Sequence, residues 1–361
     1  QCDRPLLIPA YHKLNKGTDP MTLPDSAYYD NPTQFGYRIC RTLNGLWQLA
    51  GGHGKIDPQA ALQDMLRYHD EGYITWDLAD HYGPAEDFIG AFRKELLATR
   101  GQAALDSVRA FTKWVPRPQR ITRAVVESAI DVSLRRMQVQ RLDLLQFHWW
   151  DYTDHGYMDA LRILADLRDA GKIQHVALTN FDTARLSEIT GQGIRIVSNQ
   201  VQFSIIDRRP EARMIPFCQQ NNVVLLTYGT LCGGLLSEKY VKRPEPQPGT
   251  LNTASLRKYK QMIDVWGGWT LFQELLDALK AIADKHNVTI ANVAVRCILD
   301  KPTVAGVIVG ARLGLAEHRA ENGRVFSFTL DDADRVQIEA ISAKSQDLMQ
   351  RIGDCGDEYR G

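Results

Sequence analysis

The stretch LDLLQFHWWDYTDHGYMDALRILADLRDAGKIQHVALTNF, residues 142–181, holds one full repeat of the pattern that decides the fold. An apolar run over Leu142–Trp149 is followed by a longer amphipathic stretch, a glycine turn at 170–172 and a second apolar run over His175–Phe181. Short apolar runs that alternate with longer amphipathic segments are typical of βα units in a parallel sheet. This segment therefore predicts a strand, a helix and a second strand.

The same alternation continues on both sides of this segment and predicts eight strands in all. The predicted strands are Leu43–Leu49, Tyr73–Ala79, Val108–Trp114, Leu142–Trp149, His175–Phe181, Val197–Phe203, Val223–Tyr228 and Val304–Val309. Helix signals lie between them: Asp57 with Pro58 begins one helix, and Thr122 caps another over Arg123–Met137.

Eight strands with helices between them favour an α/β fold of the (β/α)8 TIM-barrel type over an open doubly wound sheet. An open dinucleotide-binding sheet carries G-x-G-x-x-G after its first strand, and residues 51–54 here read GGHG. We therefore expect a TIM barrel over residues 37–345.

Three segments fall outside the repeat. Residues 1–36 hold five of the fifteen prolines and show no helical period, which predicts an extended N-terminal arm. Residues 237–268 include the proline-rich run 242–249 and are too long for a simple connector, and residues 346–361 form a C-terminal extension. We expect at least one of the arm, the 237–268 loop and the tail at 355–360 to cover the pocket.

Composition limits the classes of function. The 43 basic and 43 acidic residues balance to zero net charge, which argues against nucleic acid as a partner. No apolar run approaches the length needed to span a bilayer, so no membrane is expected. Six cysteines without a CxxC pair read as isolated thiols of a reducing compartment, and a cytoplasmic protein is expected. The chain begins at Gln1, which leaves a removed targeting segment open.

Ionisable residues stand at the carboxyl ends of three predicted strands, where a parallel barrel places its chemistry. They are Asp77, Tyr82, Lys113 and His148. A carboxylate and an ammonium in apolar strands are costly unless paired, so Asp77 and Lys113 are expected to face each other. Lys113 is expected to lower the pKa of Tyr82, which makes Tyr82 a proton donor to a carbonyl oxygen, and His148 is expected to orient that oxygen.

These residues have two other interpretations. A buried Asp–Lys pair taken alone is more often structural than catalytic. His148 with Asp151, Asp154 and His155 suggests a metal site, but the spacing has no helical relation and tryptophans intervene, so no metal is expected.

The segments DLADHYG at 77–83, Thr112-Lys113, 144–149 and 171–180 resemble the consecutive signatures of the aldo-keto reductase family. The resemblance covers about residues 38–340. It implies a (β/α)8 barrel and reversible hydride transfer between a nicotinamide cofactor, usually NADPH, and an aldehyde or ketone. It also implies that Tyr82, Lys113, Asp77 and His148 form the catalytic tetrad, with Tyr82 as the acid.

The resemblance further assigns residues to the ligands. Trp47 and Trp149 match positions that line the pocket of a small carbonyl substrate. His318 stands where arginine or glutamine is commoner, which leaves NADH open as a second cofactor. The residues implied to bind the cofactor, from the nicotinamide to the adenosine end, are Thr179, Asn180, Gln200, Tyr228, Leu231, Gly233, Lys239, Gly310, Arg312, His318, Glu321 and Asn322.

A regulatory function, instead of an enzymatic one, remains open as an alternative. A channel-associated regulatory subunit that binds NADP(H) as a redox sensor on the same barrel would keep the same four residues. The oligomeric state and the identity of the substrate are left open by the sequence.

Overall fold

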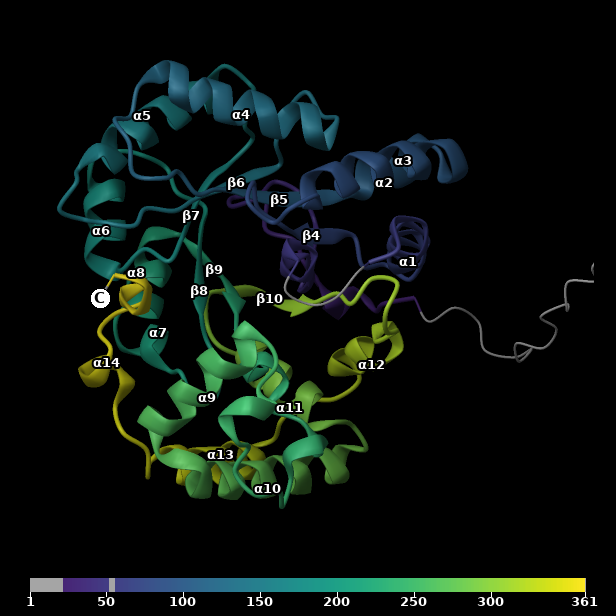
Figure 1. Ribbon diagram of the computed structural model, residues 1–361, viewed down its shortest axis with the longest axis vertical. Coiled ribbons are helices and arrows are strands. Elements are labelled where there is room, and N and C mark those ends of the chain that lie inside the picture. Colours follow the sequence, from purple (N-terminus) through teal and green to yellow (C-terminus); the bar gives the residue numbers. More distant parts are fainter. Residues whose placement is uncertain (1–21, 52–55, 361) are drawn as a thin grey trace, which may run out of the picture.

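Eight parallel strands close into a barrel in this computed structural model, which describes residues 22–51 and 56–360 (Figure 1). Each strand pairs with the next along the chain, and the last closes on the first, with Val307 opposite Thr42. This arrangement confirms the predicted TIM barrel and the place of all eight strands. The strands are β3 (Thr42–Gly45), β4 (Thr75–Asp77), β5 (Arg109–Trp114), β6 (Leu144–Phe147), β7 (Val176–Thr179), β8 (Ser198–Gln202), β9 (Val224–Tyr228) and β10 (Val304–Gly310).

Helices surround the barrel and connect its strands (Figure 1). The predicted caps are present: the Asp57 carboxylate accepts from the Gln59 N–H, and the Thr122 hydroxyl accepts from the Val125 N–H. The helices are α1 (Pro58–Asp70), α2 (Ala85–Arg100), α3 (Gln102–Ser107), α4 (Arg123–Met137), α5 (Gly156–Asp169), α6 (Thr183–Gly191), α7 (Arg209–Ala212), α8 (Met214–Asn221), α9 (Ala254–Trp266), α10 (Gly268–His286), α11 (Ile290–Leu299), α12 (Arg319–Gly323), α13 (Asp332–Ser342) and α14 (Leu348–Arg351). No helix of the described residues is both long and apolar enough to cross a bilayer.

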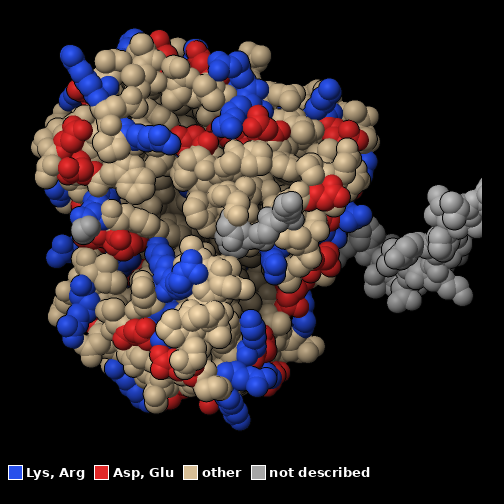
Figure 2. All heavy atoms as spheres, viewed as in Figure 1, with Lys and Arg blue, Asp and Glu red and all other residues tan. Residues whose placement is uncertain are grey.

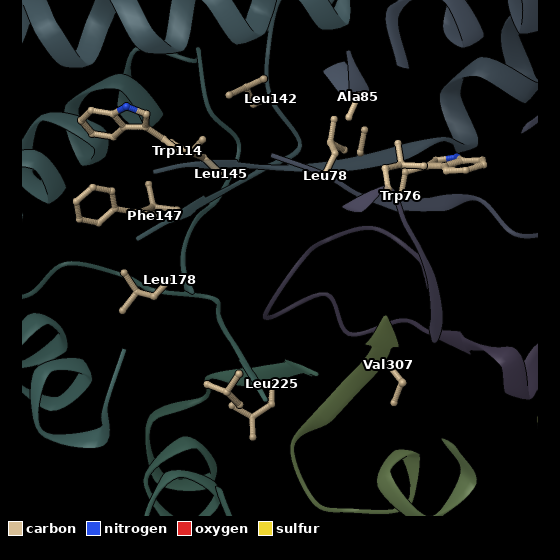
Figure 3. Packing of buried hydrophobic residues seen from close by; sticks show 14 of the residues in the cluster. Trp76, Leu78, Ala85, Trp114, Leu142, Leu145, Phe147, Leu178, Leu225 and Val307 are labelled. Carbon is tan, nitrogen blue, oxygen red and sulfur yellow. The ribbon is translucent and has the colours of Figure 1, made fainter. Parts of the chain in front are cut away.

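The strand side chains divide into an outer and an inner layer, because successive residues of a strand point to opposite faces. Trp76, Leu145, Phe147 and Leu178 belong to the outer layer and pack toward the helices (Figure 3). Phe111, Leu144, Ala177 and Leu226 form the inner apolar layer. Residues with the inner-layer parity that lie nearer the carboxyl ends of the strands are polar, and they make the site described below.

A short hairpin closes the amino-terminal end of the barrel. Its strands β1 (Tyr28–Tyr29) and β2 (Ile39–Cys40) pair antiparallel, and the turn between them carries Phe35 and Tyr37. Phe35 is fully buried and its ring stacks 5.8 Å from that of Tyr37 and 6.0 Å from that of Phe111. Residues 22–40 therefore pack beneath the barrel, and residues 1–21 of the expected arm lie outside the described residues.

Two further segments lie around the carboxyl end of the barrel. Residues 237–268, expected as a loop, contain α9, whose Tyr259 packs on Gly229 and Gly233 after β9. The chain after α13 runs through α14, and the last described residues lie beside α6 and α7, where Asp354 accepts from the Thr183 N–H and Glu358 pairs with Arg209 (Figure 1). Both segments reach the rim formed by the ends of β7 to β9.

The buried ring of Phe35, which forms a plug at the amino-terminal end of the barrel, allows a test of the fold. Phe35→Ala removes a fully buried ring and leaves a cavity, so the free energy of unfolding should fall by about 3 to 5 kcal/mol. Phe35→Leu, which keeps much of the volume, should cost less. Urea unfolding of both variants measures this, and a loss below about 1 kcal/mol for Phe35→Ala would show that the plug does not stabilise the barrel.

Candidate active site

The carboxylate of Asp77 lies at the centre of the polar layer. Asp77 ends β4 and is 3% exposed. Lys113 Nζ on β5 donates to its Oδ2 at 2.7 Å, as expected from the sequence. Gln146 Nε2 and Gln200 Nε2 donate to Oδ1 at 3.0 and 2.7 Å. Three donors from three other strands therefore replace the water that the buried carboxylate has lost.

Tyr82 lies in the turn that follows β4, above the ammonium of Lys113. Nζ of Lys113 is 5.0 Å from the centre of the Tyr82 ring, and the rings of Trp47 and His81 meet it edge-on at 4.9 and 4.8 Å. Burial raises the pKa of Tyr82 well above its usual value, and the charge of Asp77 acts in the same direction.

The pKa of Tyr82 is therefore raised overall and not lowered as expected, because burial outweighs the charge of Lys113. The carboxylate of Asp77 lies 2.7 Å from Nζ, so it offsets the positive charge of Lys113 at the ring of Tyr82. The same burial lowers the pKa of Lys113, while Asp77 raises it. Tyr82 holds its proton at neutral pH.

His148 follows β6 on the inner side of the barrel, two residues beyond Gln146. Its ring is 3% exposed, and Nδ1 lies 3.1 Å from the carbonyl oxygen of Thr179. Nε2 is buried and has no hydrogen-bond partner among the described residues. Burial lowers the pKa of His148 to about 4, so the ring is neutral at pH 7.

The two predicted pocket tryptophans lie in different places. Trp47 is 45% exposed beside Tyr82, at the mouth of the barrel. Trp149 is 4% exposed, packs on Phe147 in the outer layer, and its indole N–H donates to the carbonyl oxygens of Asp151 and Asp154. The structure does not bring Trp149 to the mouth, because a residue next to the inward His148 has the opposite parity. Trp150 contacts His148 instead, with ring centres 4.4 Å apart.

The four residues expected around a nicotinamide lie together at the ends of β7, β8 and β9. The Tyr228 hydroxyl donates to Asn180 Oδ1 at 2.7 Å, and the Thr179 hydroxyl donates to the Gln200 carbonyl oxygen at 3.4 Å. Both N–H groups of the Gln200 amide are used, on Asp77 and on Gln146. The free amide groups are therefore the nitrogen of Asn180 and the oxygen of Gln200, which suit the oxygen and the nitrogen of a primary carboxamide.

The residues expected around the phosphates and adenosine follow β9 and β10. Lys239, Arg312 and His318 are exposed, and none has a carboxylate within ion-pair distance in the described part of the chain. Exposed Gly233 lies between Leu231 and Lys239 with a φ of 67°, and Gly310 ends β10. Glu321 and Asn322 lie on α12, where Glu321 also accepts from the hydroxyl of Thr289. These cations and exposed backbone groups have the chemistry that phosphate groups require.

Basic side chains gather at the edge of the central depression of this face, over α9 (Figure 2). Lys258 of α9 reaches the site, and its Nζ lies 5.6 Å from the ring centre of Tyr228. Tyr359, near the end of the chain, lies with its ring centre 6.4 Å from that of His148. Among the described residues, no group of three or more His, Cys, Asp or Glu side chains has the geometry of a metal site.

Sequence reasoning missed four residues of this site: Gln146, Trp150, Lys258 and Tyr359. Strand parity could have found Gln146, because it stands two residues before His148 on the same strand. Trp150 could have been found as the residue after the outward Trp149. Lys258 and Tyr359 lie in the 237–268 segment and the tail at 355–360, two of the segments considered as covers of the pocket, but no local pattern singles out these two residues.

The chain is similar to known proteins both in sequence and in fold. The family model described as "Aldo/keto reductase family" matches residues 42–343. Aldo-keto reductase YhdN of Bacillus subtilis is 25% identical over 87% of this chain and 93% of its own, and NADH-specific methylglyoxal reductase of Escherichia coli is 24% identical over 82% and 93%. The solved structure of glycerol dehydrogenase AKR11B4 from Gluconobacter oxydans has the same fold, with a TM-score of 0.72 at 22% identity over 92% of this chain and 98% of that one.

The family match and the barrel with its strand-end site agree over most of the chain. The chain belongs to the aldo/keto reductase family, and it is an oxidoreductase that acts on carbonyl or alcohol groups with a nicotinamide cofactor.

Proposed function

We propose that this protein uses NADPH to reduce the aldehyde or ketone group of a small molecule to an alcohol. The observation that carries the proposal is the Tyr82 phenol beside the Lys113–Asp77 pair, at the same mouth as a buried His148 whose Nε2 has no partner among the described residues. Trp47 and Trp150 give this mouth apolar walls. Together these groups support a proton donor and an oxygen-binding position at a partly apolar pocket.

A bound nicotinamide supplies a hydride to the carbonyl carbon. Tyr82 gives its phenolic proton to the carbonyl oxygen, so the carbonyl gains a hydride and a proton and becomes an alcohol. The tyrosinate that remains is stabilised by Lys113, whose Nζ lies 5.0 Å from the ring centre. Asp77 holds that ammonium in place at 2.7 Å. Solvent returns the proton to Tyr82 before the next turnover.

In this scheme, the hydrogen-bond partner of His148 determines which of its ring nitrogens carries the hydrogen. The carbonyl oxygen of Thr179 can only accept, so Nδ1 of the neutral ring carries the hydrogen and Nε2 carries a lone pair. Nε2 therefore accepts a hydrogen bond, from the Tyr82 hydroxyl or from the alcohol formed. A lone pair on Nε2 cannot donate to the carbonyl oxygen that His148 was expected from the sequence to orient.

NADPH is the proposed cofactor because Arg312 stands exposed and unpaired after β10, at the end of the site expected to hold the adenosine. An arginine without a carboxylate partner is suited to a phosphate. NADH is proposed as a second cofactor, since one relative is named as an NADH-specific methylglyoxal reductase.

The redox-sensor alternative is less well supported. A probable voltage-gated potassium channel subunit beta from Arabidopsis thaliana is among the relatives, at 23% identity over 78% of this chain. Three relatives that cover more of the chain, 87%, 82% and 81%, are named as reductases. A panel of aldehydes and ketones, with NADPH or NADH consumption as the readout, separates the two functions: oxidation that stops at one equivalent on every substrate would support a sensor.

Tyr82→Phe tests the proton donor. Turnover should fall by at least about 100-fold, because the acid is lost, while NADPH binds with unchanged affinity. Tyr157→Phe, which removes a hydroxyl bonded to Glu188 away from the mouth, is the matched control and should keep its activity. A Tyr82→Phe protein with most of its activity would contradict the assignment.

The lowered pKa of His148 predicts a dependence of stability on pH. Its pKa is about 4 in the folded protein and near 6.5 when unfolded, so the unfolded chain binds more protons between these values and stability falls as the pH drops through that window. From pH 7 to pH 5 the contribution is about 2 kcal/mol. Urea unfolding of His148→Gln at both pH values should show a decline smaller by that amount. An equal decline in both proteins would exclude His148 as the cause.

Arg312→Gln tests cofactor choice. Losing a charged hydrogen bond to the 2′-phosphate should weaken NADPH binding by about 10-fold or more and change NADH binding by less than about twofold. The matched control is Arg120→Gln, since Arg120 is also exposed. Binding titrations measure both, and equal weakening of both cofactors would contradict a 2′-phosphate contact.

A further inference from the structure

The last described residues, 353–360, form a segment that is firmly anchored on the rim of the barrel. Glu358 forms an ion pair with Arg209 at 2.9 Å, and their side chains are 9% and 1% exposed. Arg209 also donates to the carbonyl oxygen of Asp354 at 3.0 Å. Arg360 donates to the carbonyl oxygen of Trp149 at 2.7 Å. We call residues 353–360 the terminal segment; it lies beyond residue 343, where the family match ends.

The terminal segment packs in close contact with the backbone of Asn180. Gly356 has a φ of 88°, and a Cβ atom added there would lie 2.1 Å from the carbonyl oxygen of Asn180. Such a distance is shorter than any van der Waals contact, so only glycine allows this approach. The backbone of Asn180, itself at a φ of 59°, therefore has the terminal segment as a fixed neighbour.

A chain of hydrogen bonds links the same segment to the side chain of Asn180. Lys258 Nζ donates to the Tyr359 hydroxyl at 2.5 Å. The hydroxyls of Tyr359 and Tyr228 lie 3.1 Å apart, and the Tyr228 hydroxyl lies 2.7 Å from Asn180 Oδ1. A phenol has one hydrogen. Because that of Tyr228 points to Asn180, the bond between the two phenols uses the hydrogen of Tyr359.

This order of donors determines which group of Asn180 is free. Its oxygen is occupied by Tyr228, so its NH2 group is the one available to a ligand. The Gln200 amide is turned the opposite way, since both its N–H groups are used by Asp77 and Gln146. A primary carboxamide fits between a free donor and a free acceptor in one orientation only.

We propose that Tyr359 is a positioning residue for the cofactor: by holding Tyr228 against Asn180, it sets the affinity and the orientation of the nicotinamide carboxamide. Lys258 directs the hydroxyl of Tyr359 and Gly356 lets the segment reach Asn180. The inference rests on the proposed use of a nicotinamide cofactor. It adds to the site a residue from outside the region that matches the family.

Tyr359→Phe removes one hydroxyl and keeps the ring, Arg209–Glu358 and the fold of the segment. Binding is titrated with two probes, NADPH and 2′-phospho-ADP-ribose, which has the adenosine end without the nicotinamide. NADPH affinity should fall about fivefold, the value of one hydrogen bond, with the affinity for 2′-phospho-ADP-ribose unchanged. Gly356→Ala, which displaces the segment from Asn180, should have the same selective effect, and Tyr157→Phe should have none.

Three results would overturn the proposal. Unchanged NADPH binding in Tyr359→Phe would show that the hydroxyl has no part in binding. Tighter NADPH binding would show that the segment obstructs the site instead. Equal weakening of both probes would show a general structural effect.

These binding titrations are independent of turnover. A wild-type protein that binds NADPH but reduces no carbonyl compound would defeat the proposed function and leave the role of Tyr359 to be judged by the two probes. A wild-type protein that binds neither NADPH nor NADH would defeat both. Where turnover is found, transfer of deuterium from NADPH labelled on one face of the ring should become less selective in Tyr359→Phe.

Discussion

The buried carboxylate of Asp77 is the constraint on which the rest of the site depends. A charge that is 3% exposed inside a barrel is tolerated only when donors surround it, and here the donors come from β5, β6 and β8. Each of these strands must therefore present a polar residue inward at one level of the barrel. That requirement places Lys113 beneath Tyr82 and leaves Gln200 with only its amide oxygen free.

Much of this arrangement could be predicted from the sequence because it follows from periodicity. The alternation of apolar runs and amphipathic segments gave eight strands, and the rule that chemistry gathers at their carboxyl ends brought Asp77, Lys113 and His148 to one rim. Trp149 was placed wrongly because its parity was not applied: the residue after an inward histidine faces the helices. The direction of the pKa of Tyr82 was wrong because burial is its main cause, and the depth at which the ring packs is set by the three-dimensional structure.

The contributions of Lys258 and Tyr359 have a different origin. Tyr359 meets Lys258 across 101 residues of chain and Tyr228 across 131, and no local pattern carries contacts of that range. An ion-pair network holds the terminal segment: Arg209 is buried between Asp207 and Glu358, so the charge of Glu358 is paired where the segment packs on the rim. The zero net charge of the sequence therefore gives no sign of these buried ion pairs, which hold one side of the site in place.

The hairpin at the other end of the barrel affects how protons move. Phe35 and Tyr37 close that end, and above them lies the apolar layer of Phe111, Leu144 and Leu226. Among the described residues, apolar side chains therefore fill the barrel between the hairpin and the polar layer. In the proposed reaction, the proton that restores Tyr82 after each turnover enters through the carboxyl-end opening that the substrate uses. The incoming proton and the departing product then use the same opening, so slow release of the product also delays the reprotonation of Tyr82.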